Sequence, residues 1–434
     1  LILLLGMLFL LAIGMPLGFA SGFLAVVVMV LKFEPTLLTD PFSFGSGILT
    51  GNFGSGPMNI LAQRLYGITT NYVLVSVPLF IFMATLLERS GIAKDMYSCL
   101  SQWMSRTRGG IAVVTAIMAI VMAAMSGIIG GEVVLLGLIA LPQMLRLGYN
   151  QNLAIGTICA SGSLGTMIPP SIVLIMYGLV TETSIKSLFT AAFLPGFMLA
   201  SFFIVYIIVT TQIDKSKAPL PPEDPDAPRG AEKGLMFLGF LAKFFVWAGG
   251  ALIVRNLFLT VTGQNAVVEG VDPIALGMVS DLPYLIGLVV ISALLMYFVV
   301  GKERAQKGWD MGKGLVAPIV VIGVVLGSIY MGITGITEAA GMGAIAVFVI
   351  GLIRREMTFN IVWDSLMRTL KSTGTILWVT IGASALAAAY TLAGGPTYVA
   401  NMIVSAELPT MGIILVMMLI FLIMGMFMDW IGIV

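Results

Sequence analysis

Apolar stretches long enough to cross a membrane recur along most of this 434-residue sequence, and they limit its possible folds more than any other feature. Hydrophobic residues make up 59% of the chain and charged residues 10%, whereas soluble domains carry about 25% charged residues. A spanning helix needs about 20 apolar residues. The sequence therefore predicts an all-α, polytopic membrane protein, with apolar stretches near residues 2–31, 72–88, 111–126, 130–147, 153–181, 188–212, 235–260, 283–301, 315–333, 339–353, 372–393 and 409–434.

The net charge of +1 and the absence of histidine argue against several classes of function. A nearly neutral chain is not built to bind nucleic acid. Without histidine it lacks the commonest general base and the commonest transition-metal ligand, which argues against a membrane-embedded hydrolase and leaves that class as an alternative only. Cys99 and Cys159 have no metal-type spacing and are expected to be packed thiols. The chain begins with leucine and ends within an apolar run, so we expect both ends, the C-terminus included, to be truncated.

Residues 161–171 read Ser-Gly-Ser-Leu-Gly-Thr-Met-Ile-Pro-Pro-Ser and interrupt the apolar stretch 153–181. Pro169 and Pro170 lack an N–H group and their rings clash with the preceding turn, so nearby carbonyls lose their helical partners. In lipid such carbonyls are costly unless they line a cavity or bind a ligand. Transporters build cation and substrate sites from helices broken in this way. The interruption predicts a functional site, and a proline kink sealed by neighbouring helices is the alternative.

The two halves of the chain share a coarse pattern. An apolar hairpin at about 111–147 turns near residue 127 and is followed by the interrupted stretch at about 153–181. A second hairpin at about 315–353 turns at residues 332–338 and is followed by an apolar stretch at about 372–393 that contains Thr-Ile-Gly-Ala-Ser at 380–384. A hairpin followed by a broken helix, occurring twice, fits the inverted repeats of transporters. We therefore expect two re-entrant hairpins and two discontinuous helices.

The hydrophilic stretch 213–234 is rich in proline and charge, which predicts a linker between the halves. Basic residues gather there and around 302–313 and 354–371, so these regions are expected to face the cytoplasm. The predicted organisation is a first repeat at 1–212, the cytoplasmic linker at 213–234, an inserted helix pair at 235–301 and a second repeat at 302–434.

Three motifs resemble the large membrane subunit of TRAP (tripartite ATP-independent periplasmic) transporters, the DctM type. Residues 162–171 match the family's Gly-Thr-Leu-Gly-x-x-Ile-Pro-Pro-Ser-like motif closely. Residues 334–340, Thr-Gly-Ile-Thr-Glu-Ala-Ala, resemble its Thr-Pro-Thr-Glu-Ala-Ala but lack the proline and carry an extra residue. The third match is Gly-Met-Phe-Met-Asp at 425–429. Residues 126–129 read Ser-Gly-Ile-Ile where the family often has Ser-Gly-Ser-Ser, so backbone carbonyls would replace two hydroxyl ligands there.

The resemblance implies a secondary transporter in the bacterial inner membrane, coupled to sodium entry. It would carry out symport of a small organic anion, a carboxylate, with Na+ as the coupling ion and no organic cofactor. Its implied partners are a small membrane subunit of the DctQ type, a periplasmic substrate-binding protein of the DctP type, and the surrounding membrane lipid. It also implies an elevator-type shift of a hairpin-bearing domain against a scaffold. A passive channel stays open as an alternative.

Sodium prefers neutral oxygen ligands, which broken helices supply as carbonyls and hydroxyls. The candidate sodium ligands are Ser126, Gly127, Ser161, Gly162 and Gly165 in the first half, and Gly335, Gly382 and Ser384 in the second. The candidate substrate contacts are the hydroxyls of Ser163, Thr166, Ser171, Thr334 and Thr337. Pro169 and Pro170 are expected to hold the break open, and Glu338 to cap the second arm of its hairpin. The alternative for these serines and glycines is close helix packing, and no cationic partner for the substrate is apparent in either turn.

Overall fold

The computed structural model describes residues 2–33, 57–104, 107–127, 129–220, 230–263, 281–330, 332–407 and 409–427. Every regular element in these ranges is a helix, which confirms the all-α prediction. Part of the predicted linker, most of the connection after residue 263 and the motif residue Asp429 lie outside the described ranges. The side chain of Ser126 lies outside them too.

Several helices are long and apolar enough to cross a membrane, which supports a multi-pass membrane protein. The described part of the chain holds seven of them, namely Tyr72–Arg89, Ile185–Ile213, Ala231–Val261, Leu282–Val300, Lys302–Tyr330, Ile336–Ile353 and Phe359–Leu392. The re-entrant character of the two hairpins stays a prediction, because length and composition do not distinguish a hairpin that turns within the membrane from two spanning helices.

The chain divides into two compact units. Unit 1 comprises Leu1–Pro78, Ile175–Thr183 and Arg368–Val434, and unit 2 comprises Leu79–Leu174 and Ser184–Met367. The units do not follow the predicted repeats, because unit 1 takes residues from both ends of the chain. Contacts between segments distant in sequence therefore decide which helices pack together.

Unit 1 is built from short helices around a small core of alanines and two larger side chains. Ala25, Met29, Leu61, Ala385, Ala388 and Ala389 form that core. The apolar stretch 2–31 is two helices and not the one we expected, because Gly14 adopts a left-handed φ of 83° and Pro16 follows it. The helices of this unit are α1 (Ile2–Ala12), α2 (Leu17–Phe33), α3 (Pro57–Thr69), α17 (Gly395–Ser405), α18 (Thr410–Phe427), the 3-10 helix Tyr72–Val75 and most of α16 (Phe359–Leu392).

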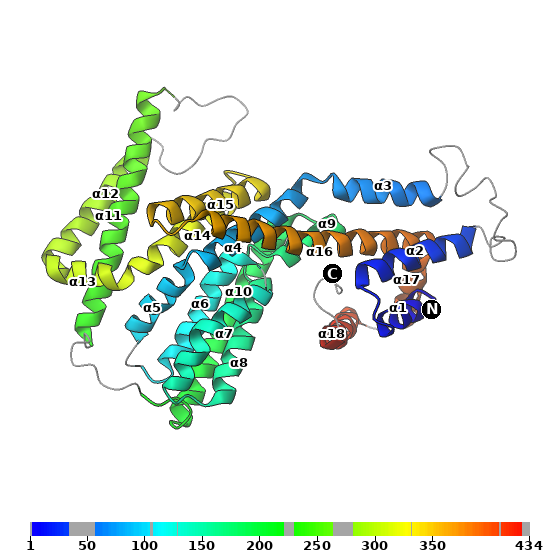
Figure 1. Cartoon of the computed structure of the whole chain (residues 1–434), viewed down its shortest axis with the longest axis horizontal. Coiled ribbons are helices and arrows are strands. Elements are labelled where there is room, and N and C mark those ends of the chain that lie inside the picture. The colour runs from blue at the N-terminus through cyan, green and yellow to red at the C-terminus, as the bar shows by residue number, and fades with distance from the viewer. Residues whose placement is uncertain are drawn as a thin grey trace. The chain divides into compact units, whose positions relative to one another are not determined.

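The first part of unit 2 holds the first hairpin and the first interruption. Helices α6, α7, α8 and α10 lie side by side (Figure 1). Ala123, Ala124, Leu164, Ile168 and Ala200 form a buried cluster where the hairpin, the interruption and α10 meet. The elements are α4 (Ser76–Arg89), α5 (Ile92–Met104), α6 (Gly110–Ser126), α7 (Ile129–Arg146), α8 (Gln151–Gly162), the 3-10 helix Ser163–Thr166, the start of α9 (Ile172–Val180, which belongs to unit 1 from Ile175 on) and α10 (Ile185–Ile213).

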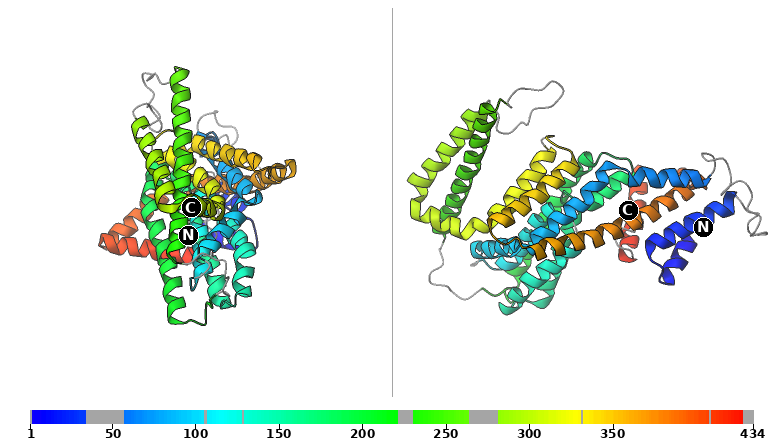
Figure 2. Two further views of the ribbon diagram at one scale, coloured as in Figure 1. Left: turned by 90° about the vertical axis from the view of Figure 1, so that its left-hand side faces the viewer. Right: turned by 45° about the horizontal axis from the view of Figure 1, so that its top comes forward.

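The second part of unit 2 holds a helix pair at 231–300 and the second hairpin. Helices α11 and α12 pack against each other, and α13 packs on α11 (Figure 2). Helices α14 and α15 pack together as the arms of the second hairpin. The elements are α11 (Ala231–Val261), α12 (Leu282–Leu294), the π-helix Leu295–Val300, α13 (Lys302–Gly312), the 3-10 helix Lys313–Leu315, α14 (Val316–Tyr330) and α15 (Ile336–Ile353).

The structure corrects the expected second discontinuous helix. Helix α16 runs from Phe359 to Leu392 and passes through residues 380–384 without a break. The hydroxyls of Thr380 and Ser384 donate to carbonyls one turn earlier, of Ile376 and Thr380, at 2.8 and 2.7 Å. Since the helix contains no proline, each backbone N–H can keep its helical partner. The freed carbonyls on which we based a sodium-ligand role for Gly382 are therefore absent from α16.

Candidate functional site

The interruption after α8 is a compact, internally bonded segment. Helix α8 ends at Gly162, one 3-10 turn covers Ser163–Thr166, and α9 starts at Ile172. Ser163 Oγ donates to the Ala160 carbonyl at 2.7 Å, Thr166 Oγ1 to the Ser163 carbonyl at 2.9 Å, and Ser171 Oγ to the Thr166 carbonyl at 2.7 Å. The Ser171 hydroxyl thus supplies the Thr166 carbonyl with the donor that Pro170 lacks, whereas the Ala160 carbonyl also accepts from the Ser163 N–H. A hydroxyl that donates in this way keeps its oxygen lone pairs available to a cation.

The tip of the first hairpin lies directly against this interruption. Gly127 ends α6 with a left-handed φ of 60°, and a Cβ there would lie 2.5 Å from the Pro170 carbonyl oxygen. A Cβ at Gly162 would overlap the Val133 side chain. Three candidate residues, Gly127, Gly162 and Gly165, therefore lie at the contact between hairpin and interruption. They allow backbone and side chains to approach more closely than any larger residue would.

Glu132 places a carboxylate at this contact. It lies in the first turn of α7 and is only 2% exposed. A Cβ at Gly165 would lie 2.7 Å from Glu132 Oε2, so the carboxylate packs on the 3-10 turn. Its position just after a hairpin turn in an apolar segment marks Glu132 as a functional carboxylate from the sequence too, although it is not among the candidate ligands named above. A buried carboxylate beside carbonyl and hydroxyl oxygens favours a bound cation.

The tip of the second hairpin is capped by its own backbone and by Glu338. The N–H groups of Ile333 and Thr334 donate to the Ser328 carbonyl at 2.9 and 3.3 Å. Gly335 is the N-cap of α15, and a Cβ there would lie 2.5 Å from Glu338 Oε2. Glu338 at the third helical position thus folds back over the cap, in the place that a capping-box glutamate takes. The neighbouring Thr337 is 5% exposed.

Lys186 brings a cation to this second tip. It lies in the first turn of α10, and a Cβ at Gly332 would lie 3.6 Å from its Nζ. Both residues belong to unit 2. Sequence reasoning missed this lysine because nothing local to residue 186 relates it to residues 332–337. The tertiary fold places the ammonium beside Gly332, in the turn that also contains Thr334 and precedes Thr337.

A small cavity in unit 1 is lined by α16 residues. It has a volume of about 150 Å³ and is lined by Thr380 and Ser384 together with Arg64 and Glu182. Arg64 and Glu182 pair at 3.4 Å and are largely exposed. Ser384 and Gly382 belong to unit 1, whereas Thr334, Gly335 and Thr337 belong to unit 2. The predicted grouping of these residues around a second sodium ion stays a prediction.

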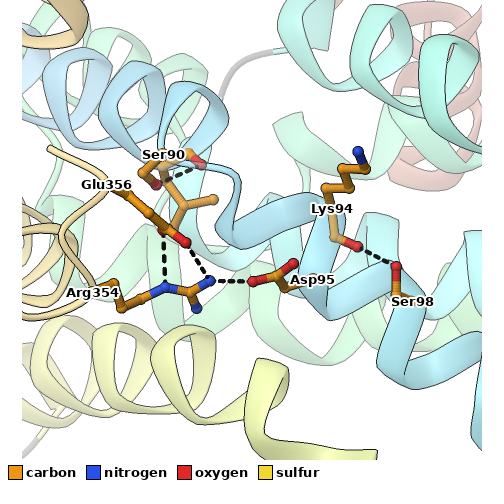
Figure 3. A network of polar contacts seen from close by, with 7 residues as sticks. Ser90, Lys94, Asp95, Ser98, Arg354 and Glu356 are labelled. Atoms are coloured by element: carbon orange, nitrogen blue, oxygen red, sulfur yellow. Dashed lines mark hydrogen bonds and ion pairs between the residues drawn. The ribbon is translucent and has the colours of Figure 1, made fainter. Parts of the chain in front are cut away.

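A polar network joins α5 to the end of α15 within unit 2 (Figure 3). Arg354 donates to both Glu356 carboxylate oxygens at 2.9 Å and also pairs with Asp95. Burial alone would lower the pKa of Arg354, but the hydrogen bonds to Glu356 and Asp95 raise it above its usual value. The adjoining cavity of about 560 Å³ also contains Lys313, which pairs with Asp310 at 3.9 Å. Both cations of this cavity are thus balanced by carboxylates, which makes it a poor site for an anionic substrate.

Comparison with known proteins gives one consistent family. The sequence matches the family described as "Tripartite ATP-independent periplasmic transporter, DctM component" over residues 4–434. The C4-dicarboxylate TRAP transporter large permease protein of Pseudomonas aeruginosa is 32% identical over 38% of this chain and 39% of that protein. The ectoine TRAP transporter large permease protein of Halomonas elongata is 33% identical over 36% of each chain. The sialic acid TRAP transporter large permease protein of Vibrio cholerae is 29% identical over 46% of this chain and 43% of that protein.

The aligned stretches thus span less than half the length of these curated relatives. The family match, in contrast, covers nearly the whole chain and includes both hairpins and the interruption between them. A permease component is not an enzyme, so the membrane-embedded hydrolase is set aside. The chain belongs to the DctM family, the large permease components of tripartite ATP-independent periplasmic transporters.

Proposed function

We propose that this chain is the permease subunit of a sodium-coupled symporter that moves a small carboxylate across the bacterial inner membrane. A periplasmic substrate-binding protein would deliver the carboxylate, and a small membrane subunit would complete the complex. The family assignment supports the permease role and the two partners. The relatives named above serve C4-dicarboxylates, ectoine and sialic acid. An elevator-type movement of the hairpin-bearing part is the mechanism we expect.

The observation that carries the sodium proposal is the contact between the first hairpin tip and the interruption. Gly127 faces the Pro170 carbonyl there, and the buried Glu132 carboxylate packs on Gly165. Sodium would be held by carbonyls of the interruption together with the hydroxyl oxygens of Ser163 and Thr166, two residues that were predicted from the sequence to contact the substrate. A single buried carboxylate supplies the negative charge that offsets the cost of placing a cation inside the membrane.

The carboxylate of the substrate would bind at the second hairpin tip. Lys186, close to Gly332, would supply the cation there, and Thr334 and Thr337 would supply hydroxyl donors. We expect Lys186→Gln to raise the substrate concentration for half-maximal uptake by roughly tenfold, or about 1.4 kcal/mol. Lys186→Arg keeps the charge and should restore most of the affinity. Unchanged substrate affinity in Lys186→Gln would show that the substrate's carboxylate binds elsewhere.

The direct test is uptake into proteoliposomes that contain the complete complex and the binding protein. Uptake should be concentrative with an inward sodium gradient, should stop when choline replaces sodium outside, and should persist without ATP. Sodium-independent but concentrative uptake would contradict sodium coupling. Flux that only ever equilibrates the substrate would favour the passive channel.

The partner requirement needs its own control. Liposomes that contain this chain alone should show no concentrative uptake, because the substrate would reach the permease only through the binding protein. Robust concentrative uptake by the single chain would contradict the three-component arrangement.

A further inference from the structure

A groove lined by both polar and apolar residues runs along unit 2 between α8 and α10. Its volume is about 340 Å³. This is about ten times the roughly 30 Å³ that one water molecule occupies in the liquid. Hydroxyl and amide groups recur along its length. The groove is lined by Asn150, Asn152, Leu153, Gly156, Thr157, Ala160, Ser161, Phe203, Tyr206, Ile207, Thr210 and Lys217.

One end of the groove is a fixed polar mouth. Asn150 Oδ1 caps α8 by accepting from the N–H groups of Asn152 and Leu153 at 3.0 and 3.2 Å. The Asn150 N–H donates to the Lys217 carbonyl at 2.9 Å, which ties the start of α8 to the turn after α10. In that turn Asp214 accepts from the hydroxyl and the N–H of Ser216, and these bonds lower the pKa of Asp214.

The other end of the groove reaches the interruption. Ser161 lines the groove, is fully buried, and its Oγ makes no hydrogen bond within the described part of the chain. Leaving a buried hydroxyl unsatisfied costs about 1–3 kcal/mol. A water molecule or a cation bound to Ser161 Oγ would remove this cost. Ser163, where the 3-10 turn starts, is two residues further on.

The length of the groove matches a path into the membrane. From Asn152 to Ser161, α8 rises about 14 Å at 1.5 Å per residue. That is close to half of the roughly 30 Å hydrocarbon thickness of a bilayer. A groove that starts at a polar mouth and follows α8 for this distance ends near mid-membrane depth, where transporters bind their ions.

We propose that the groove between α8 and α10 is a water-filled path that joins the Lys217 end of unit 2 to the interruption at residues 161–171, and that the coupling cation enters or leaves along it. The identity of the cation rests on the proposed function, whereas the presence of water in the groove does not. A lipid chain is the competing occupant of the groove.

Thiol accessibility tests the water path directly. In a background with Cys99→Ala and Cys159→Ala, single cysteines at Gly156→Cys and Ala160→Cys face the groove, and a Cβ at Gly156 meets no atom within 4 Å. The controls on the same helix are Ile155→Cys, at a position that is 41% exposed outside the groove lining, and the native exposed Cys159 restored alone. The probe is a small cationic methanethiosulfonate, applied to the complete complex in proteoliposomes.

The two groove cysteines should react roughly tenfold faster than the two controls, because only a hydrated thiol ionises to the reactive thiolate. Equal rates at all four positions, or reaction only with an apolar maleimide, would overturn the water path. Sodium, compared with choline, should slow the reaction at Ala160→Cys and leave Gly156→Cys unchanged. A reactive groove with no sodium effect at Ala160→Cys would overturn the cation path.

Failure of the proposed function and failure of the groove proposal give different results in these experiments. If uptake proves independent of sodium while both groove cysteines react rapidly, the symport proposal fails and the hydrated groove stands. If uptake requires sodium while the groove cysteines behave as the controls do, the groove proposal alone fails.

Discussion

Residues 161–171 and residues 380–384 have similar composition but different structures. Both combine glycine with serine and threonine inside an apolar stretch. The first segment ends one helix, makes a 3-10 turn and starts another helix ten residues after Gly162. The second lies within the continuous helix α16. Small hydroxyl residues therefore do not break a membrane helix by themselves.

The hydroxyls show how the two segments differ. In α16, Thr380 and Ser384 donate to carbonyls that a helical N–H can also reach. At the interruption, Ser163, Thr166 and Ser171 donate to carbonyls three or five residues earlier, and the Ser171 hydroxyl replaces the backbone donor that Pro170 lacks at the Thr166 carbonyl. The prolines at 169 and 170 make that replacement necessary. In α16, Gly382 packs closely on α2, since a Cβ there would overlap the Gly18 carbonyl oxygen and Ser21 Oγ.

The largest expected effect comes from closing the interruption with Pro169→Ala and Pro170→Ala together. One interior proline opposes a helix by about 3 kcal/mol, a factor of roughly 100, so replacing both favours a closed helix by at least about 100-fold, and uptake should fall at least as much. The matched control is Pro142→Ala within the continuous helix α7, which should leave uptake near the wild-type level. Normal uptake with a lower melting temperature would assign the two prolines to packing alone.

The converse change introduces a proline into the continuous segment. Ala383→Pro lies at an exposed position of α16 and should destabilise the protein by about 3 kcal/mol, because it removes a helical hydrogen bond and clashes with the preceding turn. The measurement is the melting temperature of the purified complex, with Ala383→Ser as the control of similar size. An unchanged melting temperature would show that α16 tolerates a break here, as we first expected from the sequence.

A smaller effect distinguishes packing glycines from free ones in the same helix. Gly382→Ala should cost about 1–3 kcal/mol, because a Cβ would meet the backbone of Gly18 on α2. Gly374→Ala meets no atom within 4 Å and should stabilise α16 by roughly 0.5–1 kcal/mol. Melting temperatures of the two variants should therefore move in opposite directions. A shift of the same sign in both would contradict the packing role of Gly382.

The smallest effect concerns the hydroxyls themselves. Ser163→Ala and Thr166→Ala should each raise the sodium concentration for half-maximal uptake by about fivefold, or about 1 kcal/mol for one lost neutral oxygen interaction. Thr380→Ala removes the same kind of group from a helix without freed carbonyls and should leave this concentration unchanged. If all three variants behave alike, the interruption is not the sodium site.

Several features of the fold were predictable because they depend on local chemistry. The proline pair located the one interruption that we expected and the structure contains, and the apolar stretches located the arms of both hairpins and the helix pair at 231–300. The break expected at 380–384 was wrong because glycine, serine and threonine, unlike the consecutive prolines at 169 and 170, leave every backbone N–H in place. The break at Gly14 and Pro16 was missed although its glycine and proline were visible in the sequence.

The sequence by itself determined the helical membrane class, the family and the broken helix with its hydroxyls, since each depends on residue type and short-range order along one chain. Only the tertiary structure decided which groups from other segments lie against the broken helix and the hairpin tips. It placed Glu132 on Gly165, Gly127 against Pro170, Lys186 beside Gly332, and Ser161 at the inner end of a polar groove. These contacts join segments that are distant in sequence, and they arise from helix packing, which no local pattern encodes.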